Sequence, residues 1–347
     1  MATILITGGA GFIGCELSHL LINAGHEVEV IDLLHPQVHA TRERPPRLNN
    51  AARLVVADVT ESDAFDVAVG SPPDVVIHLA AETGTGQSLS EATRHGLVNV
   101  VGTTRLLDFL YRTQPRPAHL ILASSRAVYG EGAWAVDGQV YVVGARKRAE
   151  LDAERWDPIP GAVSVPSVAG STEPRPTSIY GATKLAQESI LLSWCTALEV
   201  PATVLRLQNV YGPGQSLTNS YTGVIALFAR LALAGSEIEV YEDGQITRDF
   251  VHVSDVASAL ASAVDRVPID TRLLDIGSGN PTTIGRVANQ IAALAESPTP
   301  RISGAYRLGD VRAASCSIEQ AREVLGYHPA RGIEEGLSEL LDWVATT

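Results

Sequence analysis

Short apolar runs alternate with longer segments of helical period through the first two thirds of the chain. The apolar runs are rich in Val, Ile and Leu and end in Gly, Asp or Ser, which is typical of parallel strands that are buried on both faces. This alternation predicts an α/β fold with a doubly wound parallel sheet of the Rossmann type. The predicted strands cover residues 3–7, 28–32, 54–57, 75–80, 120–124 and 202–206, and the predicted helices include 13–24, 97–112 and 181–198.

Two later regions depart from this alternation. Residues 131–177 are rich in Gly, Pro and charge, so we interpret them as a surface insertion in a cofactor domain of residues 1–210, and not as part of a sheet. We expect residues 211–347 to form a smaller, mixed α/β lobe that binds the substrate, interleaved with late sheet elements at about 247–277. The substrate should then lie between the two parts, outside the carboxyl ends of the strands.

Composition and charge narrow the possible partners. The chain has 347 residues and a net charge of −13, and a net acidic surface repels nucleic acid and anionic membranes. The cysteines at positions 15, 195 and 316 are far apart and suit neither a disulfide framework nor a metal site. No uncharged run reaches the roughly 18 residues of a membrane span. We therefore expect a cytoplasmic protein that binds neither nucleic acid nor membrane.

A glycine-rich turn follows the first predicted strand and leads into a helix. Its glycines permit a tight turn and a close approach of the backbone to a pyrophosphate, while the helix N-terminus supplies amides and a positive dipole. Asp32 ends the second strand, where a carboxylate can bind the ribose hydroxyls of NAD and would repel the 2′-phosphate of NADP. NAD is the expected cofactor. The expected binding residues are Gly8, Gly11, Phe12, Ile13, Gly14, Asp32, Asp58, Val59, Leu79, Ala80 and Ala81, with a turn or capping role left open for Asp58.

Tyr180 and Lys184 are four residues apart on a predicted helix, so their side chains share one face. A tyrosine with the usual pKa of ~10 is a poor base at neutral pH, and an adjacent ammonium would lower that pKa. Ser124 and Ser125 lie at the end of a predicted strand, where a hydroxyl can bind the substrate oxygen whose proton Tyr180 handles. Tyr180, Lys184 and one of these serines are the candidate catalytic set, and Tyr180 and Lys184 also contact the cofactor. His78, at another strand end, is more typical of a structural histidine.

The order of these motifs resembles that of the extended short-chain dehydrogenase/reductases, in the nucleotide-sugar epimerase and dehydratase superfamily. The resemblance implies the catalytic roles given above, with Ser125 as the catalytic hydroxyl, and a structural role for Asn99 in supporting the active-site helix. It also implies a homodimer formed through the segments 97–112 and 181–198, with simple packing of both helices on the sheet as the alternative. The motifs are TGGAGFIG at 7–14, HLAAE at 78–82, SSRAVYG at 124–130, YGATK at 180–184, LRLQNVYGPG at 205–214 and RDFVHVSDV at 248–256.

The residues directly after Ser125 favour epimerisation among the reactions of this superfamily. The 4,6-dehydratases that the chain resembles have an Asp-Glu pair there, and the nucleotide-sugar decarboxylases have a glutamate at the second position, whereas this chain has Arg126 and Ala127. The resemblance thus implies NAD-dependent inversion at C4 of a dTDP- or UDP-hexose through a 4-keto intermediate. The motifs look most like the dTDP-L-rhamnose 4-epimerase-type group. A dehydratase, decarboxylase or 4-ketoreductase is the first alternative, and a non-catalytic dinucleotide-binding regulator is a remote one.

The anionic diphosphate of a nucleotide-sugar substrate needs local cations. The resemblance implies that Arg248 and Arg312 hold the diphosphate or nucleotide. Arg206, at a strand end, is more typical of a structural ion pair, and the Arg-Lys-Arg run at 146–148 is typical of a solvated face. No metal is expected. The expected substrate-binding residues are Thr83, Thr85, Ser125, Arg126, Asn209, Arg248 and Arg312.

Overall fold

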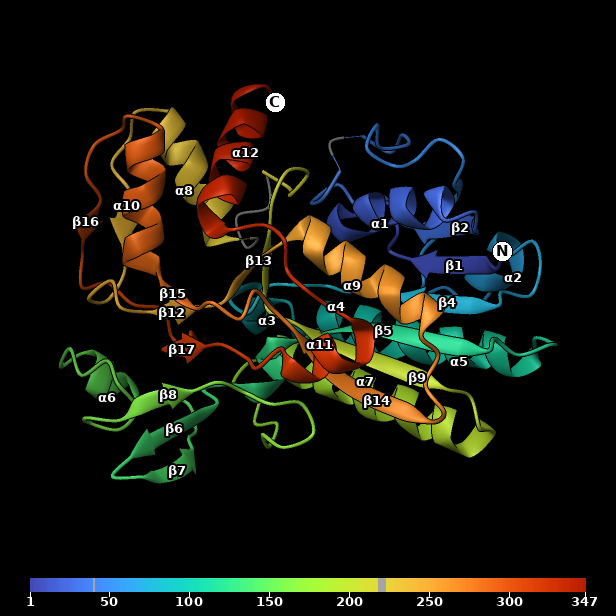
Figure 1. The fold of residues 1–347 in the computed structure, drawn as a ribbon, viewed down its shortest axis with the longest axis horizontal. Helices are drawn as coiled ribbons and strands as arrows, with labels where there is room; N and C mark the ends of the chain where they lie inside the picture. Colours follow the sequence, from blue (N-terminus) through green and yellow to red (C-terminus); the bar gives the residue numbers. More distant parts are fainter. Residues whose placement is uncertain (40, 218–222) are drawn as a thin grey trace.

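Seven parallel strands form the main sheet of the protein in the computed structural model, which describes residues 1–39, 41–217 and 223–347. Their order is β14-β9-β5-β4-β1-β2-β3 (Figure 1). The chain runs from β1 through β2 to β3 at one edge of the sheet, then returns beside β1 with β4 and continues through β5 and β9 to β14 at the other edge. This path confirms the predicted doubly wound fold of the Rossmann type. The strands are β1 (Thr3–Thr7), β2 (Glu27–Asp32), β3 (Arg53–Val56), β4 (Val75–His78), β5 (His119–Ser125), β9 (Ala202–Leu207) and β14 (Thr271–Ile276).

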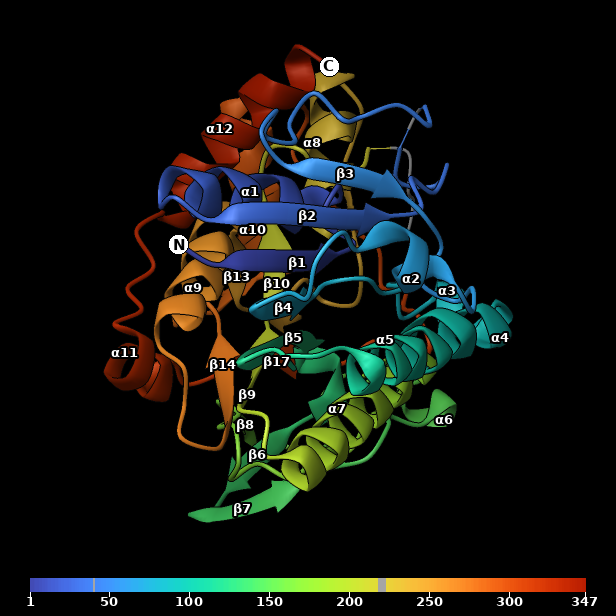
Figure 2. The ribbon, with the colours of Figure 1, turned by 90° about the vertical axis from the view of Figure 1, so that its right-hand side faces the viewer.

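Two layers of helices cover the faces of this sheet (Figure 2). Along β1, Ile4 and Ile6 face one layer while Leu5 faces the other, so the strand is buried from both sides. This burial explains why the strands are continuous apolar runs in the sequence. One layer consists of α1 (Phe12–Asn23), α9 (Val253–Asp265) and α11 (Glu319–Leu325), and the other of α2 (Ala64–Ala68), α5 (Gly102–Arg112) and α7 (Ile179–Leu198).

The insertion at 131–177 has strands of its own, which corrects the prediction that it holds no sheet element. Three antiparallel strands in the order β7-β6-β8 form a small sheet apart from the main one. Trp134 of β6 is buried, and its ring nitrogen donates to the carbonyl oxygen of Glu131 at 3.0 Å. Strands this short, among many polar residues, leave too few alternating positions to be recognised in the sequence. The elements are β6 (Ala133–Val136), β7 (Gln139–Val142), α6 (Arg148–Leu151) and β8 (Val163–Val165).

A third apolar cluster, around Phe228, Ile291 and Leu340, lies beside the sheet. The helices that build it, together with the short strands that join them, are here called the C-terminal lobe (Figure 1). Its strands pair as β10-β13, β11-β16 and β15-β12-β17, apart from the main sheet. The elements are β10 (Asn209–Tyr211), α8 (Val224–Leu233), β11 (Glu239–Val240), β12 (Thr247–Arg248), β13 (Phe250–His252), β15 (Thr282–Thr283), α10 (Ile284–Leu294), β16 (Arg301–Ile302), β17 (Ala313–Ala314) and α12 (Ile333–Ala345).

The register of the strands brings several candidate residues to one edge of the sheet. Thr7 is aligned with His78, and Ser125 is aligned with Leu207 on the neighbouring strand. The loops that leave these carboxyl ends therefore meet at that edge. Short helical segments follow two of the strands: α3 (Gln87–Ser90), α4 (Ala92–His95) and η1 (Gly96–Val101) follow β4, and η2 (Arg126–Tyr129) follows β5.

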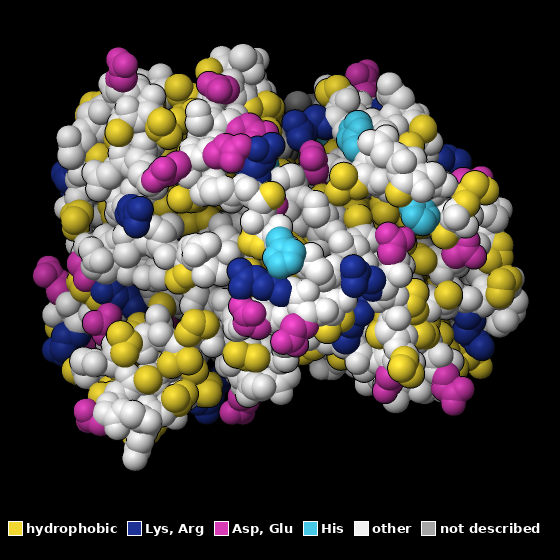
Figure 3. Space-filling model, in the orientation of Figure 1, with side chains coloured by type: hydrophobic (Ala, Val, Ile, Leu, Met, Phe, Trp, Pro, Cys, Tyr) yellow, Lys and Arg dark blue, Asp and Glu magenta, His cyan; other side chains and the backbone are white. Residues whose placement is uncertain are grey.

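Basic and acidic side chains are interspersed over the face shown in Figure 3, where no extended basic surface forms. None of the helices in residues 1–39, 41–217 and 223–347 combines the length and the apolar character needed to cross a membrane. The same residues hold no group of three or more His, Cys, Asp and Glu side chains that is placed to bind a metal ion.

Candidate active site

The turn between β1 and α1 has a shape that only glycine permits. Gly8 has a φ of +68°, and a Cβ on it would lie 2.7 Å from the backbone nitrogen of Ala80. A Cβ on Gly14 would lie 2.5 Å from Cα of Gly9, where α1 packs on the turn. The helix begins after Gly11 without a side-chain cap, which leaves its first N–H groups available to a ligand. Phe12 and Ile13 form its first turn, and the whole cradle fits the pyrophosphate of a dinucleotide.

Asp32 lies at the end of β2, beside this cradle. Its Oδ2 accepts a hydrogen bond from the backbone of Ala10 at 3.1 Å, and its Oδ1 accepts one from Leu34 at 2.9 Å. Nε2 of His39 is 3.8 Å from Oδ1, but burial lowers the pKa of His39 below its ordinary value. The imidazole is therefore mostly neutral at pH 7, and the Asp32 carboxylate keeps its negative charge uncompensated. A carboxylate in this place suits ribose hydroxyls better than a 2′-phosphate.

The loop after β3 holds Asp58 and Val59. Oδ1 of Asp58 accepts hydrogen bonds from the backbone and the hydroxyl of Thr60, at 2.9 and 2.8 Å. These contacts form the turn that the sequence left open as one role of Asp58. Val59 is buried in the core, where it lies against Gly102 of α5.

His78 has a structural role, as the sequence favoured. Its Nδ1 lies 2.6 Å from the hydroxyl of Thr7, and its Nε2 lies 2.9 Å from the hydroxyl of Thr103. Burial lowers the pKa of His78 to about 3, so the ring is neutral. The segment that follows it, Leu79–Ala81, passes directly beneath the glycine turn.

Tyr180 lies in the first turn of α7, beside the turn that follows Ser125. The helix begins after Ser178, whose hydroxyl accepts a hydrogen bond from the backbone of Gly181 at 3.1 Å. A Cβ on Gly181 would overlap the carbonyl oxygen of Ala127, so the helix start and η2 are in close contact. Burial raises the pKa of Tyr180, while a hydrogen bond with Ser125 and the positive charge of Arg126 oppose that rise.

Lys184 lies one turn deeper, between α7 and β5. Its Nζ donates to the carbonyl oxygen of Ala123 at 2.7 Å and to Oε1 of Gln187. Burial lowers the pKa of Lys184 to about 7. The positive charge that opposes the rise in the pKa of Tyr180 in this structure comes from Arg126, and the expected action of Lys184 on that pKa stays a prediction. The spacing of Tyr180 and Lys184 places them on one face of the helix, but the lysine side chain extends toward the sheet.

Asn99 supports the active-site helix, as the resemblance implied. Its Nδ2 donates to the hydroxyl of Thr183 in α7 at 2.9 Å and to the carbonyl oxygen of Glu82 at 3.0 Å. Its Oδ1 accepts from the backbone of Glu82 at 2.8 Å. Asn99 thus joins the loop after β4 to α7. Thr83 and Thr85 lie in that loop, Thr83 exposed and Thr85 half-buried.

Arg206 forms the structural ion pair that the sequence favoured. Its guanidinium donates to both carboxylate oxygens of Glu188, at 3.0 and 2.7 Å, and lies over the ring of Tyr129 at 4.7 Å from the centroid. The Tyr129 hydroxyl in turn donates to Asp275 at 2.9 Å. This buried network lies beside Ser125 and packs η2 against the sheet.

Two arginines at the substrate side, Arg248 buried and Arg126 half-buried, form no ion pair with a carboxylate in the described residues, and Asp310 and Glu131 act on them only at longer range. Arg248 donates to the carbonyl oxygens of Thr247 and Val311, each at 2.8 Å. Burial, reinforced by the nearby charge of Arg126, lowers the pKa of Arg248 to about 9. Arg126 makes no hydrogen bond or ion pair with any residue that the structure describes, and burial lowers its pKa too. Unpaired buried guanidinium groups are costly, so this region is suited to an anionic ligand.

Arg312 is placed differently from Arg248. Its guanidinium binds Asp157 at 2.8 Å, Glu242 at 3.0 Å and Asp243 at 2.6 Å. Three carboxylates thus neutralise its charge, and these contacts do not support the expected role in holding the diphosphate. Asn209 fits its expected role in substrate binding better than Arg312 does, because its side-chain oxygen is buried without a hydrogen-bond partner.

The basic run at 146–148 contains one residue that contradicts the prediction of a solvated face. The side chain of Arg146 is 2% exposed and bridges Glu131 at 3.0 Å and Glu242 at 2.8 Å. Lys147 and Arg148 are exposed, as expected. The carboxylates that pair with Arg146 come from other segments of the chain, so the local sequence around Arg146 does not indicate these ion pairs.

The sequence analysis missed Arg307 and Gln208. The guanidinium of Arg307 lies over the ring of Tyr241, 5.1 Å from its centroid, and has no carboxylate partner within the described ranges. Gln208 directly follows β9, and both polar atoms of its buried amide lack a hydrogen-bond partner. A glutamine among apolar strand residues, next to Asn209, is the one signal that the sequence offered.

Comparison with known proteins agrees with this geometry. The model of the NAD dependent epimerase/dehydratase family matches residues 4–147 and 157–274. The chain belongs to this family. It is 54% identical to the dTDP-L-rhamnose 4-epimerase of Burkholderia thailandensis over 344 residues, which are 99% of this chain and 94% of the relative. The enzyme is thus an NAD-dependent nucleotide-sugar epimerase.

Solved structures of related enzymes share the whole fold. The UDP-glucose 4-epimerase of Thermotoga maritima with UDP-glucose is 28% identical, with a TM-score of 0.79 and 99% of each chain covered. The UDP-glucose 4-epimerase of Thermus thermophilus with NAD is 26% identical, with a TM-score of 0.77 over 99% of each chain. NAD is accordingly the cofactor of this enzyme, and the glycine cradle and Asp32 described above fit it.

Proposed function

We propose that this enzyme inverts C4 of a dTDP-linked hexose and that Ser125, Tyr180 and Lys184 carry out the reaction. The observation that carries the proposal is the position of Arg126 and Arg248. Arg248 is buried and Arg126 half-buried, neither forms an ion pair with a carboxylate in the described chain, and Arg126 acts on the hydroxyl of Tyr180. A diphosphate-linked sugar would offset these charges and bring the sugar to the tyrosine.

Proton transfer at O4 is the task of Tyr180. Bound NAD supplies the hydride acceptor and donor at C4. The hydroxyl of Ser125, hydrogen-bonded to Tyr180, would orient O4 and stabilise negative charge on it as the proton leaves. Arg126 and the hydrogen bond with Ser125 oppose the rise that burial causes in the pKa of Tyr180, and the positive charge of bound oxidised NAD would oppose it further. The tyrosine would then take the O4 proton and return it after C4 has been inverted. Lys184 would hold the cofactor ribose at the base of the site.

Ala127 argues against dehydration. Elimination of water needs an acid and a base beside the carbon skeleton of the sugar, and η2 carries Arg126 and Ala127 where the sequence motif offers no carboxylate. Glu131 is the next carboxylate along the chain, but Arg146 and the backbone of Arg312 bind it. The contacts thus favour epimerisation over the dehydratase and decarboxylase alternatives.

The identity of the nucleotide and sugar is supported by the 54% identical relative, whose name gives dTDP-L-rhamnose as its substrate. We propose the same substrate class for this enzyme, a dTDP-6-deoxyhexose. The diphosphate would be held by Arg248 and by Arg307, whose guanidinium is bound only by the face of Tyr241 among the described contacts. Asn209, Thr83 and Thr85 remain candidates for contacts with the nucleotide and the sugar.

The test is C4 inversion by purified holoenzyme, followed by NMR with dTDP-L-rhamnose and UDP-glucose and without added NAD. We expect inversion of the dTDP sugar. Tyr180→Phe should lower kcat by about 10²- to 10⁴-fold, because it removes the proton acceptor and keeps the ring. Bound NAD should remain, since the ring still packs on His95 with 6.3 Å between centroids. Loss of water, release of CO₂ or stoichiometric consumption of NADH would contradict the proposal.

We also propose a homodimer formed through α5 and α7. A shallow groove between these helices is lined by Leu107, Ile190 and Trp194, and Tyr111 at the end of α5 is 59% exposed. The two helices lie side by side on the outside of the molecule (Figure 2). Pairing with a second copy would remove this apolar surface from water.

Light scattering tests the dimer. Ser193→Arg places a long cation in the groove and should halve the molar mass, whereas Ser236→Arg on the C-terminal lobe should leave it unchanged. Equal masses for both variants and wild type would contradict the proposed interface. A cytoplasmic location is proposed as well, supported by three cysteines that are buried as free thiols.

A further inference from the structure

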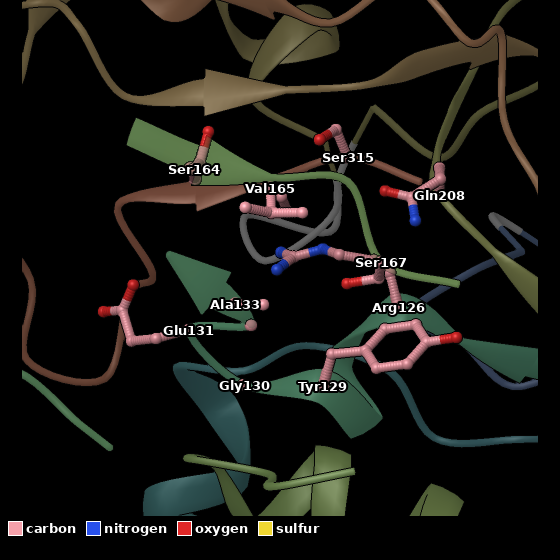
Figure 4. Close-up of a pocket in the computed structure, with 13 residues that line it drawn as sticks. Arg126, Tyr129, Gly130, Glu131, Ala133, Ser164, Val165, Ser167, Gln208 and Ser315 are labelled. Atoms are coloured by element: carbon pink, nitrogen blue, oxygen red, sulfur yellow. The ribbon is translucent and has the colours of Figure 1, made fainter. Parts of the chain in front are cut away.

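A small cavity of about 10 Å³ lies between the turn after Ser125 and the insertion (Figure 4). Arg126 and Tyr129 of η2 form its floor, and Gln208 stands at one side. The insertion supplies a further wall through β8 and the segment after it, and β17 with Ser315 supplies another. The insertion therefore lines the cavity directly, although it is remote from the main sheet. A volume of this size has room for about one water molecule, so it admits a single hydroxyl group of a ligand and not a whole ring.

The polar side chains around this cavity are unpaired. Gln208 is 4% exposed, and neither its amide nitrogen nor its amide oxygen has a hydrogen-bond partner. The hydroxyls of Ser164, Ser167 and Ser315 and the guanidinium of Arg126 make no hydrogen bond to any residue in the described ranges. Buried polar groups are nearly always paired, so the two unpaired atoms of the Gln208 amide indicate a ligand group that pairs them, with Arg126 and the three serines beside it as further donors and acceptors.

The unpaired groups face a common space. Figure 4 shows the guanidinium of Arg126 reaching into the middle of the cavity, with the amide of Gln208 turned toward the same region. An amide offers both donors and an acceptor, and a guanidinium offers donors only. Hydroxyl groups of a sugar ring can satisfy both, since each hydroxyl donates and accepts.

The cavity adjoins the reacting groups. Arg126 directly follows Ser125, and Gln208 directly precedes Asn209, at the ends of the paired strands β5 and β9. Ser167 joins the insertion to the segment after β17, because its backbone nitrogen donates to Ser315 at 2.9 Å. A sugar ring with C4 at Tyr180 and Ser125 would thus extend its remaining hydroxyls toward Gln208.

We propose that Gln208 is a specificity-determining residue that hydrogen-bonds a ring hydroxyl of the hexose, in a subsite completed by Arg126 and by β8 of the insertion. This inference rests on the proposed function, because it takes a nucleotide-linked hexose as the ligand. The thiol of Cys316 also lies near the amide, but a thiol is a weak partner and does not satisfy both polar atoms. Gln208 binds the sugar and not the nucleotide, so its effect depends on which sugar is bound.

The experiment compares Gln208→Leu with wild type and with Gln320→Leu, the same change at an exposed position of α11. Calorimetry on the holoenzyme gives the Kd of dTDP and of dTDP-L-rhamnose, and NMR gives kcat/KM for C4 inversion. Gln208→Leu should leave the Kd of dTDP unchanged and lower kcat/KM for dTDP-L-rhamnose about 10- to 100-fold, the loss of a hydrogen bond to a buried polar group. Gln320→Leu should match wild type.

Deoxy analogues identify the hydroxyl. If Gln208 binds the hydroxyl at C2 or C3, a dTDP-hexose lacking it should bind wild type about 10- to 100-fold more weakly and should bind Gln208→Leu with no further loss. Gln208→Met, with a side chain of similar length, takes the place of Gln208→Leu if the latter loses NAD or unfolds. The inference would be overturned if Gln208→Leu weakened the binding of dTDP itself to the same extent. It would also be overturned if Gln208→Leu lost as much affinity for both deoxy analogues as wild type does.

A carboxylate ligand is a separate outcome of the same experiment. If wild type prefers UDP-glucuronate to neutral hexoses and Arg126→Gln abolishes that preference, the cavity recognises a carboxylate and the inference is wrong. The proposed function can fail independently. Wild type that binds dTDP-L-rhamnose without inverting C4 would contradict epimerisation, while the calorimetric comparison of Gln208→Leu with wild type would still decide the role of Gln208.

Discussion

The two halves of the main sheet prepare their ligand sites in different ways. On the cofactor half, at β1, β2 and β4, the site consists of backbone groups and glycines, with Asp32 as its one charged group. On the substrate half, at β5, β9 and β14, it consists of side chains such as Arg126, Gln208 and Arg248. Within the described ranges, the most deeply buried Asp, Glu, Lys and Arg residues lie after residue 130, and Arg126 just before them is half-buried. The ligand site of the cofactor half therefore depends on steric fit, and that of the substrate half depends on buried charges.

The largest expected effect comes from the buried charges of the substrate half. Arg146→Met leaves Glu131 and Glu242, each 1% exposed, without the guanidinium between them. Removing one partner of a buried pair costs about 3–5 kcal/mol, so the free energy of unfolding should fall by that amount. Urea unfolding at pH 7 measures it. Loss of the pair should also loosen the insertion and raise KM for the sugar nucleotide.

Arg301 provides the matched control. It also bridges two glutamates, Glu237 at 2.9 Å and Glu239 at 3.5 Å, but its side chain is 55% exposed. Exposed pairs contribute at most about 1 kcal/mol, so Arg301→Met should barely change the unfolding curve. Equal losses in Arg146→Met and Arg301→Met would remove the distinction between buried and exposed charge on which the comparison depends.

The second prediction concerns the cofactor half. Gly14→Ala puts a Cβ 2.5 Å from Cα of Gly9, and backbone there cannot yield without moving the start of α1. The cost of such overpacking is about 1–3 kcal/mol, and displacement of the helix N-terminus should release NAD from the purified enzyme. Bound NAD, measured after denaturation of the protein, reports it. In Gly96→Ala, where nothing lies within 4 Å of the added Cβ, NAD should be retained.

The third prediction concerns the charge beside the glycine cradle. Asp32→Asn removes a carboxylate that would bind the ribose hydroxyls, so NAD affinity should fall about 10-fold and the discrimination against NADP should shrink. Calorimetry with both dinucleotides measures the change. Asp58→Asn is the control, because Asp58 already binds Thr60. A loss of NAD affinity in Asp58→Asn would assign it the adenine contact, and an unchanged preference in Asp32→Asn would contradict the role of Asp32.

The same difference explains what the sequence could predict. The glycine cradle is local: Gly8, Gly14 and the helix start lie within a few residues, and the steric reason for each glycine is visible in the motif. The strands could be predicted because burial on both faces leaves continuous apolar runs. His78, Asn99 and Arg206 also have the structural contacts that were expected of them.

The side-chain pairings of the substrate half could not be predicted from local motifs in the same way. Arg146 and Arg312 were assigned to solvent and to the diphosphate, yet carboxylates from distant segments bind both. Glu242 is 96 residues from Arg146 and 70 from Arg312, so their pairing depends on the assembled fold. Gln208 was missed because its importance comes from the lack of a partner in a cavity, which no spacing along the chain reveals.

An effect that depends on pH is expected at Asp275, in β14. The Tyr129 hydroxyl donates to its carboxylate at 2.9 and 3.0 Å, and burial raises the pKa of Asp275 to about 7. Between pH 4 and pH 7 the folded protein therefore holds a proton that the unfolded chain has released. This group makes the free energy of unfolding fall as pH rises through that window, by at most about 1.4 kcal/mol per pH unit. Above pH 7 both states are ionised and the slope from this group vanishes.

Asp275→Asn should remove this contribution, because an amide still accepts the Tyr129 hydrogen bond and does not titrate. Urea unfolding at pH 5 and pH 8 should then show the variant gaining stability relative to wild type at pH 8. Asp265→Asn is the control, since Asp265 is 73% exposed and should leave the slope as it is. Equal slopes in Asp275→Asn and wild type would mean that Asp275 stays ionised in the folded protein. The network would then balance two buried carboxylates, Asp275 and Glu188, against the single cation of Arg206.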